Sequence, residues 1–409
     1  MSTSRRQFLT TAIGSTAVLA VGARPPQFLL NAAAAEPPTG NDSILVVVEL
    51  SGGNDGLNTI VPYADDEYRK NRPQLGIGES SVLRIDDYCG FHPSLRGFAE
   101  LLEKGELAIV QGVGYPNPNR SHFESMDIWH TCHQDKQQRA DGWLGRYLDA
   151  AYQNRGVGIP AMHFGSEKQP LALAAQRIRV PSLQSLDSLQ LKGDQDELTA
   201  IGELTSAGRA VANPLLGFVQ SSSTAALSAS ERVRSRLQKY EAESKYPESS
   251  LANKLQLVAQ LIDAGMETRV FYVALDGFDT HSQQSDAHAG LLRQLGDAVQ
   301  AFLQDVSAHD HGDRVLVTAF SEFGRRVQEN ASAGTDHGAA APMFCAGSRV
   351  RAGLHGAHPS LTDLQEGDLK HHTDFRQVYA TILEDWLAWK SRSVLDGPYE
   401  TLPLIKGQT

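Results

Sequence analysis

Residues 44–59 constrain the fold more than any other stretch of this 409-residue chain. Residues 44–50 are a run of leucine and β-branched residues broken only by a glutamate, which predicts a strand buried on both faces, as in a parallel sheet. The run breaks at Gly52-Gly53, where glycine permits a tight turn and close backbone approach. Asn54 and Asp55 follow at the strand end, where open α/β sheets bind ligands, so we predict that they bind a cation or orient a substrate. The alternative is an ordinary loop in which Asp55 caps the next helix or turn.

Further periodic segments predict an α/β fold. Residues 95–104 carry apolar side chains at helical spacing, and residues 107–111 are a second buried run, so a strand, a crossover helix and a strand follow one another. We expect one domain over residues 40–409, a mostly parallel central sheet with helices on both faces. Amphipathic segments within residues 193–268 predict a helical insertion or cap over the sheet. Further strands are expected at 269–275, 314–320 and 341–347, and further helices at 288–306 and 375–387.

Ser121 follows the second strand, after a loop rich in proline and asparagine, at the position where the next helix should begin. A helix N-terminus offers free N–H groups and the positive end of the dipole, both suited to an anion. The alternative is an N-cap serine, with Glu124 completing a capping box. Arg120 and His122 flank the hydroxyl, and a cation and an imidazole at these positions suit attack on a phosphate or sulfate ester.

Carboxylates and histidines follow three later strands or loops. Asp276, Asp279 and His281 follow one strand and are typical of a site for a hard or borderline cation, with a solvated aspartate-rich turn as the alternative. Glu322 follows the next strand. Asp336-His337 lies between glycines, so each residue could serve one of two metals, or one could orient the other. Because adjacent parallel strands end at one rim of a sheet, we expect all these groups to form one two-metal site for phosphoryl or sulfuryl transfer.

Residues 1–35 match a twin-arginine export signal. Arg5 and Arg6 precede the bulky pair Phe8-Leu9, a mildly apolar run follows, and the alanines at 32–35 offer a cleavage site. The alternative is a plain disordered N-terminus. We therefore expect a periplasmic or secreted protein that is exported by the twin-arginine machinery. No later apolar run is long enough to span a membrane, so the mature protein is expected to have no membrane segment.

Charge and cysteine content narrow the classes of partner. The formal net charge of −11 argues against nucleic acid, which would need a basic face. It does not exclude a small anionic ester, because metal ions can reverse the local potential. The three cysteines, Cys89, Cys132 and Cys345, form no Cys-x-x-Cys motif, so a thiolate metal site is not expected. One disulfide among them is compatible with the sequence, and the odd number leaves at least one without an intramolecular partner.

Over nearly its whole mature length the chain resembles an exported bacterial family known as domain of unknown function 1501. The resemblance rests on the twin-arginine leader and on five motifs in order: residues 50–58, 119–123, 277–281, 321–326 and 334–338. That family is similar to the alkaline phosphatase and sulfatase superfamily, which implies a mostly parallel sheet with helices on both sides. It also implies a metal-dependent hydrolase of phosphate or sulfate esters.

The same resemblance implies roles for individual residues. The first metal-binding aspartate of the superfamily falls on Asp55, the nucleophile on Ser121, and the aspartate and histidine of the next cluster on Asp279 and His281. The superfamily's Asp-His pair falls either on Asp336 and His337 or, in a rival alignment, on Glu322-Phe323, with His337 as the final histidine.

Two departures from the superfamily pattern matter. Asp279 and His281 are only two residues apart, whereas the superfamily usually spaces this pair by a helical turn. The Cys-x-Pro-x-Arg motif is absent, which argues against a formylglycine sulfatase. The predicted catalytic residues are Ser121, His122 and Arg120. The predicted ligands of a divalent ion, either zinc, calcium or manganese, are Asn54, Asp55, Asp279, His281, Glu322, Asp336 and His337. The alternative function is a non-catalytic metal- or ligand-binding protein that kept the fold.

Overall fold

The computed structural model describes residues 43–152, 159–165, 167–183, 235 and 239–407. In this described part a nine-stranded sheet has the order β13-β5-β12-β9-β1-β8-β6-β7, and β16 also pairs with β5. Its strands are β1 (Ile44–Ser51), β5 (Leu107–Gly114), β6 (Ala161–Phe164), β7 (Ser182–Leu183), β8 (Val270–Asp276), β9 (Val315–Phe320), β12 (Ala341–Ala346), β13 (Gly353–His355) and β16 (Thr373–Asp374).

The sheet is mostly parallel, as the sequence predicts. β1 lies near its centre and pairs in parallel with β8 on one side and with β9 on the other. β12 runs antiparallel to both β9 and β5. β12 can run antiparallel to β9 because the chain joins them through a short hairpin at residues 325–337 and not through a crossover helix.

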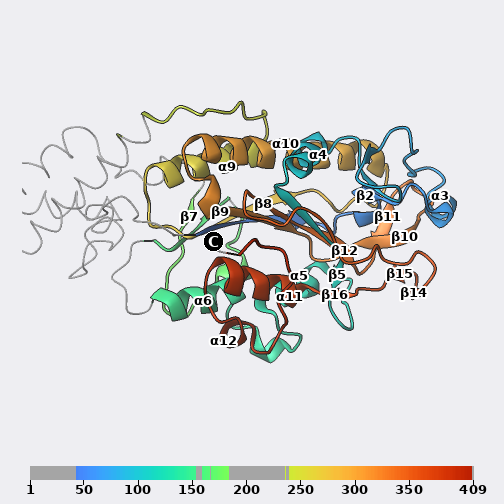
Figure 1. Cartoon of the computed structure of the whole chain (residues 1–409). Coiled ribbons are helices and arrows are strands. Elements are labelled where there is room, and N and C mark those ends of the chain that lie inside the picture. Colours follow the sequence, from blue (N-terminus) through green and yellow to red (C-terminus); the bar gives the residue numbers. More distant parts are fainter. Residues whose placement is uncertain (1–42, 153–158, 166, 184–234, 236–238, 408–409) are drawn as a thin grey trace, which may run out of the picture.

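Two layers of helices cover the sheet, one on each face (Figure 1). One layer holds α4 (Arg96–Glu103), α9 (Ser250–Asp263) and α10 (Gln284–Ala308). The other layer holds α5 (His122–Thr131), α6 (Trp143–Tyr152), α11 (Phe375–Thr381) and α12 (Arg392–Leu395). A π-helical turn, Ile382–Trp386, continues α11. The α/β class with helices on both faces is confirmed.

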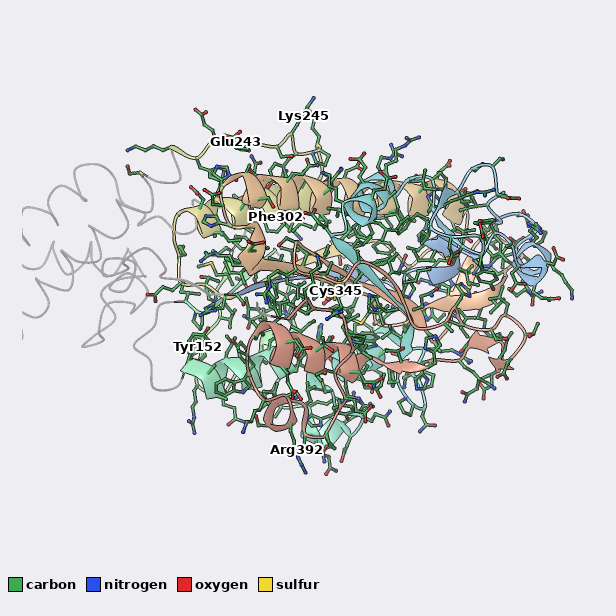
Figure 2. All side chains as sticks on the ribbon, in the orientation of Figure 1. Tyr152, Glu243, Lys245, Phe302, Cys345 and Arg392 are labelled. Atoms are coloured by element: carbon green, nitrogen blue, oxygen red, sulfur yellow. The ribbon has the colours of Figure 1, made fainter. Side chains whose placement is uncertain are left out.

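The alternation of side chains along β1 explains the two layers. Val46 lies in the same apolar cluster as Phe302 of α10, whereas its neighbour Leu45 lies in the opposite cluster with Trp129 of α5. Successive side chains of a strand point to opposite faces, so an uninterrupted apolar run requires cover on both sides. Figure 2 shows Phe302 and Cys345 inside the molecule, while the side chains of Lys245 and Arg392 point outward. All three cysteines are free and buried.

The segment predicted as a helical insertion or cap, 193–268, is described only in part. Residues 184–234 and 236–238 lie outside the described residues. Its described helix α9 packs against α10 and β8 and buries Leu251 and Leu255 in the core, as a member of the main helical layer. Within the described residues, no helix has the length and apolar character that crossing a membrane requires.

Short elements surround the carboxyl ends of the central strands, at the right of Figure 1. At this end the 3-10 turn η1 (Gly56–Asn58) and strand β15 (Asp368–Leu369) both contact β10 (Arg325–Glu329). The short strands are β2 (Ile60–Val61), β3 (Leu83–Arg84), β4 (Gly90–Phe91), β10 (Arg325–Glu329), β11 (Thr335–His337), β14 (Leu364–Gln365) and β15 (Asp368–Leu369). The short helix α3 (Asp66–Asn71) and the 3-10 turn η1 (Gly56–Asn58) also lie there. The other 3-10 turns are η2 (Lys136–Gln138), η3 (Leu171–Leu173), which contacts α5 and α6, and η5 (Gly312–Arg314), which directly precedes β9.

Candidate metal centre

The glycine pair after β1 lets two loops approach each other closely. Gly52 and Gly53 have φ of 118° and 74°, a region that L side chains rarely adopt. A Cβ on Gly52 would overlap the backbone nitrogen of Asp279, and one on Gly53 would overlap the ring of Phe323. The predicted tight turn and close backbone approach are therefore present, and they seat the β8 loop directly against the β1 loop.

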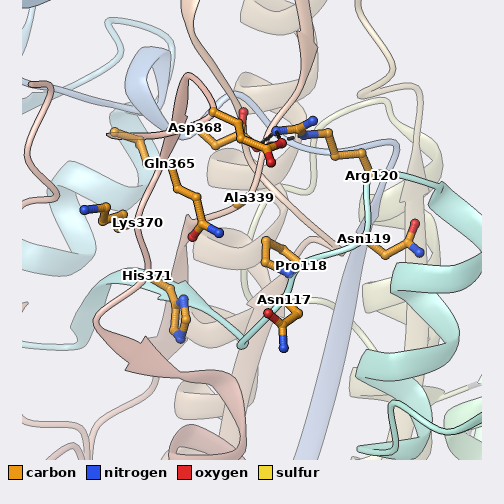
Figure 3. Close-up of a pocket in the computed structure, with 11 residues that line it drawn as sticks. Asn117, Pro118, Asn119, Arg120, Ala339, Gln365, Asp368, Lys370 and His371 are labelled. Atoms are coloured by element: carbon orange, nitrogen blue, oxygen red, sulfur yellow. Dashed lines mark hydrogen bonds and ion pairs between the residues drawn. The ribbon is translucent and has the colours of Figure 1, made fainter. Parts of the chain in front are cut away.

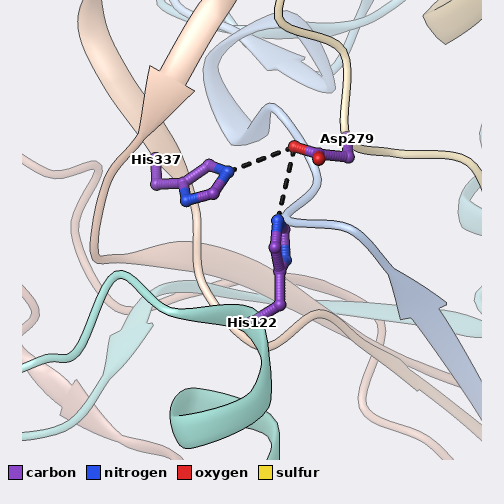
Figure 4. A group of neighbouring side chains, drawn as sticks. All are labelled: His122, Asp279 and His337. Atoms are coloured by element: carbon purple, nitrogen blue, oxygen red, sulfur yellow. Dashed lines mark hydrogen bonds and ion pairs between the residues drawn. The ribbon is translucent and has the colours of Figure 1, made fainter.

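Asp279, in the loop after β8, is the hub of a cluster of histidines (Figure 4). Its Oδ1 lies 3.0 Å from Nε2 of His281, 3.1 Å from Nε2 of His337 and 3.4 Å from Nε2 of His122. Nε2 of His281 and Nε2 of His337 are themselves 2.9 Å apart. These four residues come from three segments that are far apart in the chain, and a carboxylate surrounded by imidazole nitrogens is a donor set suited to a metal ion.

The Nδ1 atoms of the same histidines face acceptors. Nδ1 of His337 lies 2.7 Å from the backbone oxygen of Arg120, and Nδ1 of His122 lies 2.8 Å from Oε1 of Glu322. Since a carbonyl or carboxylate oxygen can only accept, each Nδ1 carries the hydrogen. In the neutral ring the Nε2 lone pair then points into the cluster, and Nε2 of His122 is buried with no hydrogen-bond partner in the described structure. This is the usual arrangement of metal-binding histidines.

Glu322 and Asp336, predicted as ligands, lie behind the histidines. Glu322 is buried, and its Oε1 accepts from the backbone N–H of Gly52 at 2.9 Å as well as from His122. Oδ1 of Asp336 lies 3.5 Å from Nδ1 of His281. The structure therefore places both carboxylates where they orient histidines. The hydrogen bond to Glu322 raises the pKa of His122 above 6.5.

Arg325 is a positioning residue to which the sequence analysis assigned no role. It is buried, and its guanidinium donates to Oδ1 of Asp279 at 2.8 Å, to the carbonyl of Gly53 at 2.7 Å and to the carbonyl of Thr335 at 2.7 Å. Although partial burial opposes ionisation of Asp279, the hydrogen bond and the charge of Arg325 lower its pKa to about 2. The arginine pair Arg325-Arg326, shortly after a predicted strand end, is the sequence feature that could have indicated this positioning role.

Asn54 and Asp55 lie in a buried layer, and their side chains are not in the histidine cluster. Both carboxylate oxygens of Asp55 bind Arg72, at 2.6 and 3.1 Å, and Gln284 donates to the same carboxylate at 2.5 Å. Oδ1 of Asn54 lies 2.9 Å from Nε2 of His288. Arg72 lies in a polar, turn-rich stretch in which nothing local marks it as the partner of Asp55.

Ser121 and Arg120 directly precede His122 in the chain, and their side chains lie in different environments. Ser121 is the N-cap residue of α5, exposed, and its side chain makes no capping hydrogen bond, while Glu124 pairs with Lys136 and Arg139 instead of forming a capping box. Only the backbone carbonyl of Arg120 contacts a cluster histidine, because its guanidinium pairs with Asp368 and Glu366. Phe323, from the rival alignment, packs its ring against His122 and His337.

Residues 42–388 match the family described as "protein of unknown function (DUF1501)", and the chain belongs to this family. No curated protein sequence matches it. Matching solved structures include the C-terminal periplasmic domain of EcEptC from Escherichia coli, at 10% identity and a TM-score of 0.37, covering 89% of this chain and 88% of that one. Another is the PsFucS1 sulfatase from Pseudoalteromonas sp., at 11% identity and a TM-score of 0.37, covering 93% of this chain and 75% of that one.

A third matching structure is a protein in the alkaline phosphatase superfamily from Vibrio parahaemolyticus, at 7% identity and a TM-score of 0.36, covering 81% of this chain and 71% of that one. Identities and scores this low carry no argument about activity. The evidence for chemistry is therefore the geometry of the chain's own residues.

Proposed function

We propose that this protein is an exported, metal-dependent hydrolase of phosphate or sulfate esters. The observation that carries the proposal is the convergence of Nε2 atoms from three histidines on one carboxylate oxygen, with two of the Nδ1 atoms held by close acceptors. Export is inferred from residues 1–35, which lie outside the described residues, and fractionation of cells that produce the full chain tests it.

The donor set supports zinc among the three ions expected from the sequence. His122, His281, His337 and Asp279 would hold the ion, and imidazole with carboxylate suits zinc, whereas calcium takes oxygen ligands. A bound divalent ion would stabilise the negative charge that develops on the ester oxygens. Glu322 and the backbone carbonyl of Arg120 keep the rings of His122 and His337 oriented.

Ser121 is the side chain we assign to the nucleophile or to the binding of the substrate anion. It directly precedes His122, and its hydroxyl is exposed and not used to cap the helix. The N-terminus of the ten-residue helix α5 adds backbone N–H groups and a positive dipole end, both of which favour an anion. Hydrolysis consumes water and yields the alcohol together with phosphate or sulfate.

One observation favours the alternative, a metal-binding protein without catalysis. Asp55, predicted as a ligand of a first metal, has both oxygens bound to Arg72 and lies fully buried. The described residues then offer one cluster, where the sequence predicted two. A single ion can still catalyse ester hydrolysis, so we retain the hydrolase as the conclusion.

The test combines metal content with turnover. We expect purified, zinc-loaded wild-type protein to hydrolyse phenyl phosphate or phenyl sulfate, with about one equivalent of metal measured by mass spectrometry. His337→Ala should lose both metal and turnover because it removes one of the converging donors. Ser121→Ala should keep the metal and lose turnover by about a hundredfold or more.

His355→Ala is the matched control, because the ring of His355 is hydrogen-bonded to the backbone carbonyl of Arg351 and lies outside the cluster. It should retain metal and turnover. Wild type that binds zinc but hydrolyses no ester of either class would favour the non-catalytic alternative. Wild type that binds no metal would contradict both functions.

A further inference from the structure

A pocket with a volume of about 420 Å³ lies between the loop at residues 117–120 and the hairpin formed by β14 and β15 (Figure 3). This volume is in the range of about 300–1,000 Å³ that is common for small-molecule sites. None of the cluster histidines lines it. It is therefore a separate cavity with its own chemistry.

Arg120 connects this pocket to the candidate metal centre. Its backbone carbonyl accepts the hydrogen of His337 Nδ1 at 2.7 Å, while its guanidinium lies in the pocket wall. Ala339, two residues after His337 in the segment between β11 and β12, also lines the pocket. The two sites thus share a wall, and one molecule could reach both.

The charged side chains of the pocket are already paired. Arg120 lies 2.6 Å from Asp368 and 3.3 Å from Glu366, and Lys370 pairs with Asp363. Two cations and two carboxylates line the pocket, so their formal charges cancel. An anionic group would meet no unpaired lysine or arginine among these described lining residues, and would be better placed at the metal centre.

The remaining groups suit hydroxyls, which both donate and accept hydrogen bonds. Asn117 and Gln365 line the pocket with amide side chains that can donate and accept, whereas the side-chain oxygen of Asn119 accepts from the backbone N–H of Ser121 at 2.8 Å. Asp368 is buried, and its Oδ2 accepts from Nε of Arg120 at 2.8 Å, so this carboxylate fixes the guanidinium of Arg120 in the pocket wall.

We propose that this pocket binds a sugar, the neutral and hydroxyl-rich part of an ester whose phosphate or sulfate group lies at the metal centre. The proposal rests on the proposed function, because it assigns the alcohol part of the substrate. The apolar side chains of Pro118 and Leu369 in the lining offer contacts for the C–H face of a sugar ring.

Saturation-transfer NMR on the full, zinc-loaded chain tests the pocket without requiring turnover. The probes are neutral methyl glycosides of glucose, galactose and N-acetylglucosamine, with inorganic phosphate as competitor. We expect millimolar binding of at least one glycoside that phosphate does not displace. Gln365→Trp, at an exposed position of β14, should weaken this binding at least tenfold by filling the pocket, and Gln365→Leu should weaken it by removing the amide.

Thr362→Trp is the matched control, because Thr362 is exposed in the same segment and does not line the pocket. It should bind as the wild type does. The sugar pocket is refuted if no glycoside binds, if phosphate displaces the glycoside, or if the Gln365 variants bind like the control. Glycoside binding without hydrolysis of any ester would refute the hydrolase and leave the sugar site standing, so the two failures are distinguishable.

Discussion

At the scale of single residues, the two nitrogens of each cluster histidine have separate roles. In His122 and His337 the Nδ1 hydrogen is held by an acceptor, so each ring has its orientation and tautomer set before any ion binds. The acceptors, Glu322 and the backbone of Arg120, come from different loops. A change at Glu322 should therefore act on the metal through His122 and not by direct coordination.

The buried pair of Asp55 and Arg72 gives a prediction about stability. Both side chains are 0% exposed, so removing one partner leaves an uncompensated buried charge. We expect Arg72→Ala to lower the free energy of unfolding by about 3–5 kcal/mol in urea titrations. Lys70→Ala removes an exposed pair with Glu67 and should cost about 1 kcal/mol or less. Equal costs for the two variants would contradict the assignment.

The same pair predicts a pH dependence. Burial opposes ionisation of Asp55, but the charge and hydrogen bonds of Arg72 outweigh it and lower the pKa to about 2, from 3.8. A carboxylate with a depressed pKa stabilises the fold above its unfolded pKa, and this contribution is lost as the pH falls through the folded value. The stability difference between wild type and Asp55→Asn should thus shrink by about 2 kcal/mol from pH 5 to pH 2. A stability difference that stays constant from pH 5 to pH 2 would contradict the lowered pKa of Asp55.

At the scale of elements, glycine determines how closely helices α4 and α10 pack. A Cβ on Gly97 of α4 would overlap the carbonyl oxygen of Gly296 in α10, so the two backbones meet without side chains between them. Both helices bury their apolar side chains in one cluster over the sheet. A methyl group at this contact must force the helices apart.

This contact yields a prediction with an internal control. Gly97→Ala should lower the free energy of unfolding by about 1–3 kcal/mol, the usual cost of overpacking. Gly290, also in α10, has open space around its Cβ position, so Gly290→Ala should raise it by up to about 1 kcal/mol through helix propensity. Thermal and urea unfolding of both variants measure these changes in the free energy of unfolding. Stabilisation by both substitutions would show that α4 and α10 do not meet there.

At the scale of the whole molecule, the candidate metal centre ties together segments from across the chain. Its members follow β5, follow β8 and lie in β11, so an ion bound there would connect the segments that follow β5 and β8 with β11. Because the unfolded chain does not hold these donors together, an ion that binds the folded state raises its stability.

Metal removal should therefore lower the melting temperature of the full chain. At a free zinc concentration a hundred times the dissociation constant, linkage predicts a loss of about 2.7 kcal/mol when a chelator is added. His281→Ala should show a smaller loss, because one donor is already missing. A reducing agent should leave the melting temperature unchanged, since all three cysteines are free. A chelator effect as large in His281→Ala as in the wild type would contradict the ligand set.

The strands and helices were predictable because their signals are local. The apolar runs match β1, β5, β8, β9 and β12, and the helical spacings match α4, α10 and α11, with small shifts at the ends. Burial on both faces of β1 follows from the composition of the run itself. The polar groups after each strand were visible for the same reason, as was the glycine turn that brings the loops together.

The sequence by itself therefore determined the elements, the class of the fold and a short set of polar residues at strand ends. Only the tertiary structure decided which of them converge. Asp55 and Asp279 are both aspartates after a strand, yet one is bound by Arg72 in the interior and the other is surrounded by histidines. The physical reason is that side-chain partners come from distant segments, as with Arg325 and the carbonyls of the β1 turn. Periodicity reports the direction in which a side chain points, and the partner that meets it depends on the folded whole.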